Sequence, residues 1–171
     1  NDPGITPDAI AKGLTTATWP ARMQRLRVGP LGEMAERAGA DLWLDGGHNP
    51  HAARALAEVA RSMCARDGRP VTIILGLLQR KDVAGILEAF RPLDARLIAT
   101  GFSSDLAAAP ESIAAAAQGQ AVEVAANPGA ALALALNRKG AEDAPPPHII
   151  LCGSLYMAGE VLVMDPSTWP T

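Results

Sequence analysis

Few residues in this sequence suit disulfide bonds, structural metal sites or nucleic-acid binding. Its two cysteines, Cys64 and Cys152, lie far apart within apolar segments, so neither a disulfide framework nor a cysteine metal site is expected. Aromatic residues make up 4% of the chain, the formal net charge is -3, and no run of Lys or Arg occurs. A basic, aromatic surface for nucleic acid is therefore missing, and we expect no nucleic-acid partner.

Long apolar runs and targeting signals are also missing. No apolar stretch approaches the length that crosses a bilayer, so no membrane partner is expected. The first residues, Asn1–Gly4, show no signal-peptide pattern and no initiator Met. We therefore expect a reduced, cytoplasmic protein and interpret this chain as beginning inside a longer one.

What the sequence does contain is an alternation of short apolar runs and Ala-rich stretches. The hydrophobic fraction is 49% in 171 residues, which suits one compact domain with a sizeable core. The apolar runs predict strands at Met23–Val28, Asp41–Leu44, Val71–Leu75, Ala95–Thr100, Ala121–Val124 and His148–Cys152. The other stretches predict helices at Pro7–Thr15, Pro50–Arg66, Val83–Arg91, Pro110–Gln118, Pro128–Arg138 and Ser154–Val163. Strands separated by helices imply βαβ units, so the predicted fold is α/β. We expect a Rossmann-like three-layer sandwich, with a mostly parallel sheet of about six strands and helices on both faces.

The strongest local pattern is the segment Leu42–Pro50. An apolar strand ends in Asp45, two glycines follow, and Asn49 and Pro50 suit the cap and first position of a helix. Ligands of open α/β sheets bind at the carboxyl ends of strands, and a helix start offers free N–H groups to an anion. Asp45 and His48 are therefore candidate ligand-binding residues. The alternative is an ordinary strand-to-helix turn with Asp45 as a cap and His48 on the surface.

Four segments together resemble the folylpolyglutamate synthases of the Mur ligase superfamily. Asp45–Pro50 reads DGGHNP and is similar to the family's DGAHNP. Trp19–Gln24 (WPARMQ) resembles its WPGRxQ element, and Gly153–Val161 (GSLYMAGEV) resembles its GSLYLVGEV element. Gly76–Asp82 (GLLQRKD) resembles its GxxxDKD stretch. All four occur in the family's order and span most of the chain.

Three positions depart from the family's pattern. Ala21 replaces a Gly and Gly47 replaces an Ala. Both exchanges are between small residues, so we expect a ligand still to approach the backbone closely. Arg80 stands where the family usually has Asp, so any role of that position is in doubt, although Lys81 and Asp82 remain. We interpret Lys81 and Asp82 as an ordinary pair at a helix start.

The resemblance implies that residues 1–171 form one carboxy-terminal, glutamate-binding domain. Residues 1–20 would be an interdomain linker and first helix. The family's enzymes add L-glutamate to dihydropteroate or tetrahydrofolate through an acyl phosphate, using ATP and Mg2+. The chain has no Gly-x-x-x-x-Gly-Lys-Ser/Thr loop, in agreement with an ATP-binding amino-terminal domain that is absent from it. The isolated domain is expected to be inactive, and the enzyme to be a monomer.

The resemblance also implies roles for five residues. Arg22 and His48 would be catalytic, and with Asp45 they would contact ATP. Ser154, His48 and Tyr156 would bind the substrate glutamate, and no residue is expected to bind a metal. Simpler interpretations remain open: Arg22 as a surface arginine, Ser154 as a helix cap, and Tyr156 as a packing residue.

Two other functions remain possible on the sequence alone. One is a Mur ligase domain of peptidoglycan precursor synthesis, although the Asn-Pro after His48 favours the folate branch. The other is a stand-alone small-ligand binding module without catalysis. Folds of this kind host many functions, so the fold cannot separate these possibilities.

Overall fold

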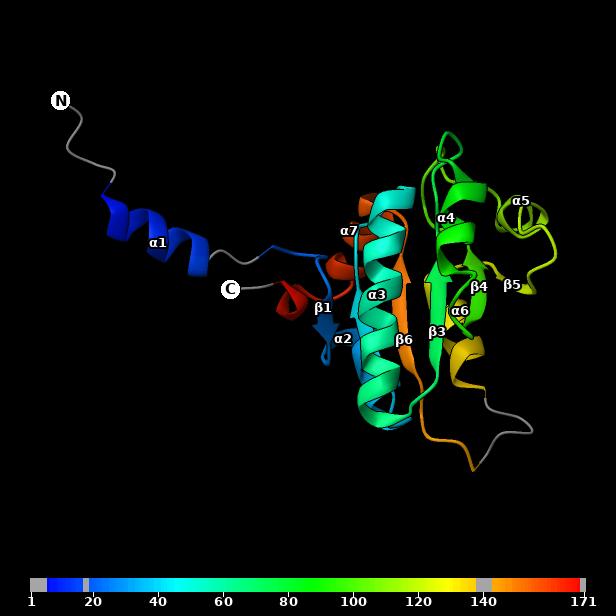
Figure 1. The fold of residues 1–171 in the computed structure, drawn as a ribbon, viewed down its shortest axis with the longest axis horizontal. Coiled ribbons are helices and arrows are strands. Elements are labelled where there is room, and N and C mark those ends of the chain that lie inside the picture. The colour runs from blue at the N-terminus through cyan, green and yellow to red at the C-terminus, as the bar shows by residue number, and fades with distance from the viewer. Residues whose placement is uncertain (1–5, 17–18, 138–142, 170–171) are drawn as a thin grey trace.

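A six-stranded sheet forms the centre of the molecule (Figure 1). The computed structural model describes residues 6–16, 19–137 and 143–169. The strand order is β1-β2-β6-β3-β4-β5. The edge strand β1 is antiparallel to β2, and all other neighbours are parallel. The strands are β1 (Gln24–Leu26), β2 (Asp41–Leu44), β3 (Val71–Leu75), β4 (Arg96–Thr100), β5 (Val122–Ala125) and β6 (His148–Cys152).

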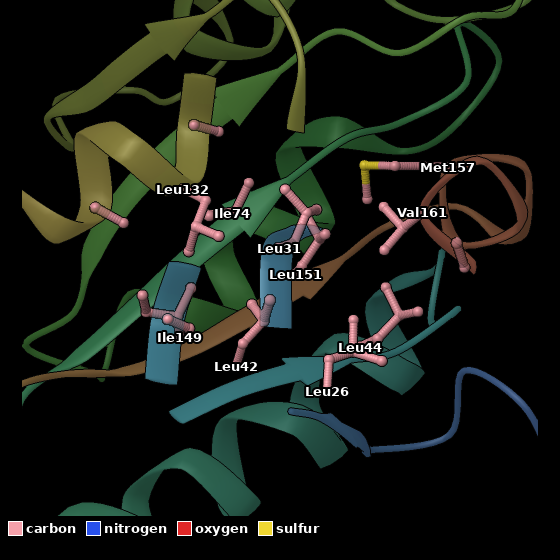
Figure 2. Close-up of a cluster of buried hydrophobic side chains, with 14 of the residues drawn as sticks. Leu26, Leu31, Leu42, Leu44, Ile74, Leu132, Ile149, Leu151, Met157 and Val161 are labelled. Carbon is pink, nitrogen blue, oxygen red and sulfur yellow. The ribbon is translucent and has the colours of Figure 1, made fainter. Parts of the chain in front are cut away.

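Helices cover both faces of this sheet, because successive residues of its inner strands point to opposite sides. In β6, Ile149 and Leu151 belong to one buried cluster, whereas Ile150 and Cys152 belong to the other. Figure 2 shows the first cluster, which also contains Val161 of α7. The helices of this face are α2 (Gly29–Arg37), α6 (Pro128–Leu136) and α7 (Leu155–Val163). Those of the other face are α3 (Pro50–Asp67), α4 (Val83–Phe90) and α5 (Pro110–Ala115).

The predicted α/β class and mostly parallel sheet are confirmed. Three of the predicted strands have the observed bounds, and β1 is shorter than predicted. Helix α2 was not predicted, because Gly29, Pro30, Gly32 and Gly39 resemble the composition of a loop. In the structure Pro30 occupies the start of α2, where a missing N–H costs nothing. A Cβ on Gly32 would lie 2.7 Å from the backbone of Arg27, so this glycine permits close packing.

Two segments lie at the ends of the described chain. Helix α1 (Pro7–Thr16) has no buried residue and lies away from the sheet (Figure 1). The short 3-10 helix η1 (Pro166–Thr168) follows α7. Residues 1–5, 17 and 18 of the predicted linker, and Arg138 of the predicted sixth helix, lie outside the described residues. None of the described helices combines the length and apolar character of a membrane span.

A buried histidine joins several elements at the amino ends of the parallel strands. His148 begins β6 and is fully buried, and its Nε2 lies 3.0 Å from Oδ2 of Asp67 at the end of α3. Arg69 donates to Oδ2 of Asp41 at 2.6 Å and to the backbone of Pro146 at 2.6 Å. These contacts join β2, α3 and β6 at the end of the sheet where the parallel strands begin.

This cluster predicts an acid-sensitive contribution to stability. Partial desolvation raises the pKa of Asp67, but hydrogen bonds from His148 and the Arg69 N–H lower it more, from 3.8 to about 2. A carboxyl whose folded pKa is lowered stabilises the fold above its unfolded pKa. The contribution should therefore be complete above about pH 4 and be lost as the pH falls through 2. NMR titration of the Asp67 carboxyl should give the low midpoint, and Asp67→Asn should flatten the dependence of unfolding free energy on pH over that window. A midpoint at 3.8 would contradict the prediction.

Candidate functional site

Three turns meet at the carboxyl ends of neighbouring parallel strands. The turn 45–49 follows β2, Gly153 and Ser154 follow β6, and the turn 76–82 follows β3. Because the strands are adjacent in the order β2-β6-β3, these turns lie side by side along one edge. Ligands bind at this edge in open α/β sheets. Arg22 reaches the same edge from the segment that precedes β1.

Asp45 connects two of the segments that resemble the family. Its side chain is almost buried, with 7% of the residue exposed. Oδ2 accepts a hydrogen bond from Met23 N at 2.8 Å, and Oδ1 accepts one from Gly47 N at 2.7 Å. The backbone adds a third link, since Gly46 N donates to the Ala21 carbonyl at 2.8 Å. Asp45 therefore holds the turn of Arg22 against the turn of His48.

The turn that presents Arg22 is held in an unusual backbone conformation. Ala21 and Met23 have φ angles of 53° and 44°, in the left-handed region that costs a non-glycine residue about 1–2 kcal/mol. Gln24 stabilises the turn, since its Oε1 accepts from Ala21 N at 3.0 Å. The small side chain of Ala21 was expected to keep the backbone accessible, as Gly would. The structure shows in addition that residue 21 has a positive φ, at which Gly is less strained than Ala.

Arg22 lies over Gly46. Its Nη1 donates to the Ala21 carbonyl at 3.1 Å, and a Cβ added to Gly46 would come 2.9 Å from this nitrogen. The same Cβ would overlap the end of the Leu155 side chain. Gly46 thus leaves room for the guanidinium at this edge. Arg22 itself is exposed, so its other N–H groups can meet a ligand.

His48 has a defined orientation. Its Nδ1 lies 2.9 Å from the Gly46 carbonyl oxygen, which can only accept, so we assign the proton to Nδ1. In the neutral ring Nε2 then carries the lone pair. The next residue, Asn49, caps α3 by accepting from Ala52 N at 2.9 Å. This cap fixes the start of α3, and His48 is the residue directly before the cap.

Two hollows flank His48. The Arg22 hollow has a volume of about 300 Å³ and is lined by Arg22, Met23, Asp45, Gly46, Gly47, His48, Asn49, Ala52, Ala55, Leu56 and Val59. The Ser154 hollow has a volume of about 140 Å³ and is lined by His48, Leu78, Lys81, Gly153, Ser154, Leu155 and Tyr156. His48 lines both hollows, so groups bound in the two could meet at its ring.

Ser154 is both a helix cap and a wall of its hollow. The residue is 2% exposed, and its Oγ accepts from Tyr156 N at 3.1 Å and Met157 N at 3.5 Å at the start of α7. Its hydroxyl proton is free of those two bonds and can donate to an anion. Tyr156 is 60% exposed, so it is not the packing residue that one interpretation suggested.

The structure brings together all five predicted site residues, and it adds Lys81. Lys81 is half-buried and lines the Ser154 hollow, whereas its neighbour Asp82 caps α4 by accepting from Gly85 N at 2.9 Å. The helix-start interpretation therefore applies to Asp82 and not to Lys81. The family-like segment Gly76–Asp82 already contains Lys81, at the position of the Lys in the family's GxxxDKD stretch. Among the described residues, no group of three His, Cys, Asp or Glu side chains is placed to hold a metal ion.

The chain is similar to known proteins both in sequence and in structure. The family described as "Mur ligase, glutamate ligase domain" matches residues 21–155. A folylpolyglutamate synthase of Lacticaseibacillus casei is 28% identical over 158 residues, which cover 92% of this chain and 32% of that protein. A dihydrofolate synthase/folylpolyglutamate synthase of Mycobacterium tuberculosis is 33% identical over 110 residues, covering 64% of this chain and 20% of that protein.

A solved folylpolyglutamate synthase structure is also similar to this chain in three dimensions. The folylpolyglutamate synthase of Mycobacterium tuberculosis, complexed with ADP and AMPPCP, is similar with a TM-score of 0.70 and 28% identity. The match covers 94% of this chain and 35% of that one. The chain thus spans about a third of the length of the L. casei relative and of this solved structure.

Proposed function

The chain belongs to the Mur ligase family of glutamate ligase domains, and we propose that it is the carboxy-terminal, glutamate-binding domain of a folylpolyglutamate/dihydrofolate synthase. The complete ligase would join L-glutamate to dihydropteroate or a tetrahydrofolate with ATP, acting as a cytoplasmic monomer. One observation carries the proposal: His48 lines both the hollow of Arg22 and the hollow of Ser154. A phosphorylated acceptor and an amino acid bound in these hollows would react next to its ring.

The first step transfers a phosphoryl group. An oxygen of the acceptor carboxylate attacks the γ-phosphorus of ATP, ADP leaves, and an acyl phosphate remains. Negative charge on the phosphoryl oxygens must be stabilised, and a preorganised cation does this well. Arg22 is suited to this role because its charge is permanent and its planar donors match phosphate oxygens. Its turn is fixed through Asp45.

The second step forms the amide bond. The glutamate amine attacks the acyl carbon, the bond from that carbon to the phosphate oxygen breaks, and the nitrogen gives up a proton. A positioned base accelerates such a step. His48 can take the proton on Nε2, because Nδ1 donates to the Gly46 carbonyl. Its ring therefore acts as the base at the junction of the two hollows.

The Ser154 hollow supplies the contacts for the incoming glutamate. The Ser154 hydroxyl donates to a carboxylate oxygen, and the start of α7 adds a favourable dipole. Lys81, which lines the same hollow, contributes a positive charge, and Tyr156 contacts the exposed side of the ligand. These are the groups that an amino acid with two carboxylates requires.

Asp45 and the metal ion have different parts in the proposal. Both carboxylate oxygens of Asp45 accept backbone hydrogen bonds, so its main role is to position the turns of Arg22 and His48. Its remaining lone pairs are the ones that a ribose hydroxyl of ATP would use. The described residues do not fit a Mg2+ cage. Mg2+ and most ATP contacts would belong to the amino-terminal domain of the ligase.

Two alternatives make different predictions. A Mur ligase of peptidoglycan synthesis would use a peptidoglycan precursor in place of a folate, but both curated relatives above carry folate-enzyme names. A stand-alone binding module would bind glutamate or nucleotide as an isolated chain. The ligase hypothesis expects weak binding at best, since both hollows are open to solvent and await a partner domain.

The proposal predicts glutamate-dependent phosphate release by the complete protein with dihydropteroate or tetrahydrofolate. Arg22→Ala should lower kcat by about 100- to 1,000-fold, the usual effect of removing one preorganised charge or donor. Arg22→Lys keeps the charge without the planar fork and should recover part of the loss. Ser154→Ala should mainly raise the KM for glutamate. Phosphate release that requires a peptidoglycan precursor, or wild-type rates in all variants, would refute the assignment.

A further inference from the structure

The short helix η1 is connected to the turn that presents Arg22. Helix α7 begins at the Ser154 hollow, and η1 follows the end of this helix. In η1 the carbonyl of Thr168 accepts a hydrogen bond from Nε2 of Gln24, the first residue of β1. The two residues are 144 positions apart in the sequence. The proposed chemistry assigns no role to this connection.

The side-chain amide of Gln24 bridges η1 and the Arg22 turn. Its Oε1 accepts from Ala21 N at 3.0 Å, while its Nε2 donates to the Thr168 carbonyl. A backbone N–H only donates and a carbonyl only accepts, so these two partners fix the orientation of the amide. A flipped amide would lose both hydrogen bonds. The bridge therefore joins the two segments in a single arrangement.

Thr168 gives this bridge a firm anchor. The residue is 6% exposed, and its Oγ1 lies 2.9 Å from the Leu162 carbonyl oxygen of α7 and 2.7 Å from the Asp165 carbonyl oxygen. Leu162 belongs to the first buried cluster. On another side η1 packs against the start of α2, where a Cβ on Gly29 would come 3.1 Å from Cγ2 of Thr168. Because α7 and α2 both hold η1, this segment can hold Gln24 in place.

The Arg22 turn needs such an anchor because its backbone is strained. The positive φ angles of Ala21 and Met23 persist in non-glycine residues only where the surroundings enforce them. Asp45 holds the turn from one side by accepting from Met23 N, and Gln24 holds it from the other by accepting from Ala21 N. Without Gln24 the backbone at Ala21 would relax, and the guanidinium of Arg22 would lose its fixed position.

We propose that Gln24 is a positioning residue of the ligase: anchored on η1, it holds the Arg22 guanidinium beside the phosphoryl group that is transferred. The inference rests on the proposed function, because Gln24 acts on the reaction through Arg22. Gln24 and Thr168 are not among the residues that line the Arg22 hollow or the Ser154 hollow. Loss of the bridge should therefore lower kcat and leave the KM for glutamate unchanged.

The test measures glutamate-dependent phosphate release by the complete protein. Gln24→Met keeps the length of the side chain but removes both hydrogen bonds, so kcat should fall by about tenfold. In an Arg22→Ala background the same substitution should lower kcat by less than about twofold, because the residue that Gln24 positions is already gone. Asn127→Ala is the matched control. It removes the cap of α6, which follows the opposite edge strand β5, and should leave kcat unchanged.

A second pair of variants tests the anchor. Thr168→Val keeps the shape of the side chain and removes its hydroxyl, so kcat should fall by about threefold. Thr168→Ser keeps the hydroxyl and should retain the wild-type kcat. Amide hydrogen exchange gives a readout that does not depend on turnover. The Gly46 N–H, which donates to the Ala21 carbonyl, should exchange faster in Gln24→Met and in Thr168→Val than in the wild-type protein.

The outcomes separate this role from a merely structural one. A fall in kcat that disappears in the Arg22→Ala background, together with faster exchange at Gly46, supports the positioning role. An unchanged kcat in Gln24→Met, an equal fall in both backgrounds, or a matching rise in the KM for glutamate overturns the inference and leaves the proposed function intact. Absence of glutamate-dependent phosphate release by the wild-type protein overturns the proposed function, and the positioning role with it.

Discussion

A His48→Ala variant of the complete ligase is expected to lose about 100- to 10,000-fold in kcat, the usual contribution of a positioned base. The reason is the position of the ring between the two hollows, with Nδ1 held by the Gly46 carbonyl at 2.9 Å. His48→Asn should be nearly as slow, since an amide can replace a hydrogen bond but cannot take up the amine proton. Single-turnover phosphate release with saturating glutamate measures this step.

His51 provides the matched control for this prediction. It lies three residues further along, in the first turn of α3, and is exposed. It lines neither of the two hollows. His51→Ala should therefore keep the wild-type rate. If His48→Asn retained more than a tenth of the wild-type kcat, His48 would be a positioning residue and not the base.

Gly153→Ala is expected to have the largest effect on stability, about 2–5 kcal/mol, from the sum of backbone strain and overpacking. Gly153 has a φ of 113°, and a Cβ there would overlap the Gly76 carbonyl oxygen. That oxygen belongs to backbone and cannot move aside like the end of a side chain. A loss of this size is a large part of the 5–15 kcal/mol that typically stabilises a domain. Urea unfolding followed by circular dichroism measures it.

Two other glycines serve as controls that separate backbone strain from the overlap with Gly76. Gly68 also has a positive φ, of 71°, but nothing lies within 4 Å of an added Cβ, so Gly68→Ala should cost only about 1–2 kcal/mol of strain. Gly159 lies inside α7 with an open Cβ position, and Gly159→Ala should stabilise the helix by up to about 1 kcal/mol. Equal losses in all three variants would contradict the proposed overlap with Gly76.

The site residues differ in how far the sequence could predict them. Asn49 and Pro50 predict the start of α3 through local capping, and the structure has that helix and that cap. The face of α3 was harder to predict. In the sequence, Val59 lies three residues after Leu56, a spacing that puts both on one apolar face of a helix. In the structure Val59 is 38% exposed and lines the Arg22 hollow. Periodicity indicates which residues share a face, but it does not indicate where the neighbouring elements stop covering it.

The role of Asp45 and the surroundings of Arg80 show the same limit. A carboxylate at a strand end suggests a ligand contact, whereas the structure directs both of its oxygens to backbone N–H groups. Arg80 was only a departure from a family pattern, because nothing local to the turn 76–82 indicates a cavity. A cavity lined by Leu78, Gln79, Arg80, Lys81 and Leu106 exists because the loop after β4 pairs with this turn, and that pairing joins residues almost 30 positions apart.

The sequence alone determined the α/β class, most of the strands and helices, and the likeness to folate ligases, because these depend on local patterns of apolar, capping and turn residues. Only the tertiary structure decided that β6 lies between β2 and β3, which brings the turns of His48, Lys81 and Ser154 to one edge. Strand order depends on the packing of both core clusters at once. That packing sums contacts between distant residues, which no local window of the sequence contains.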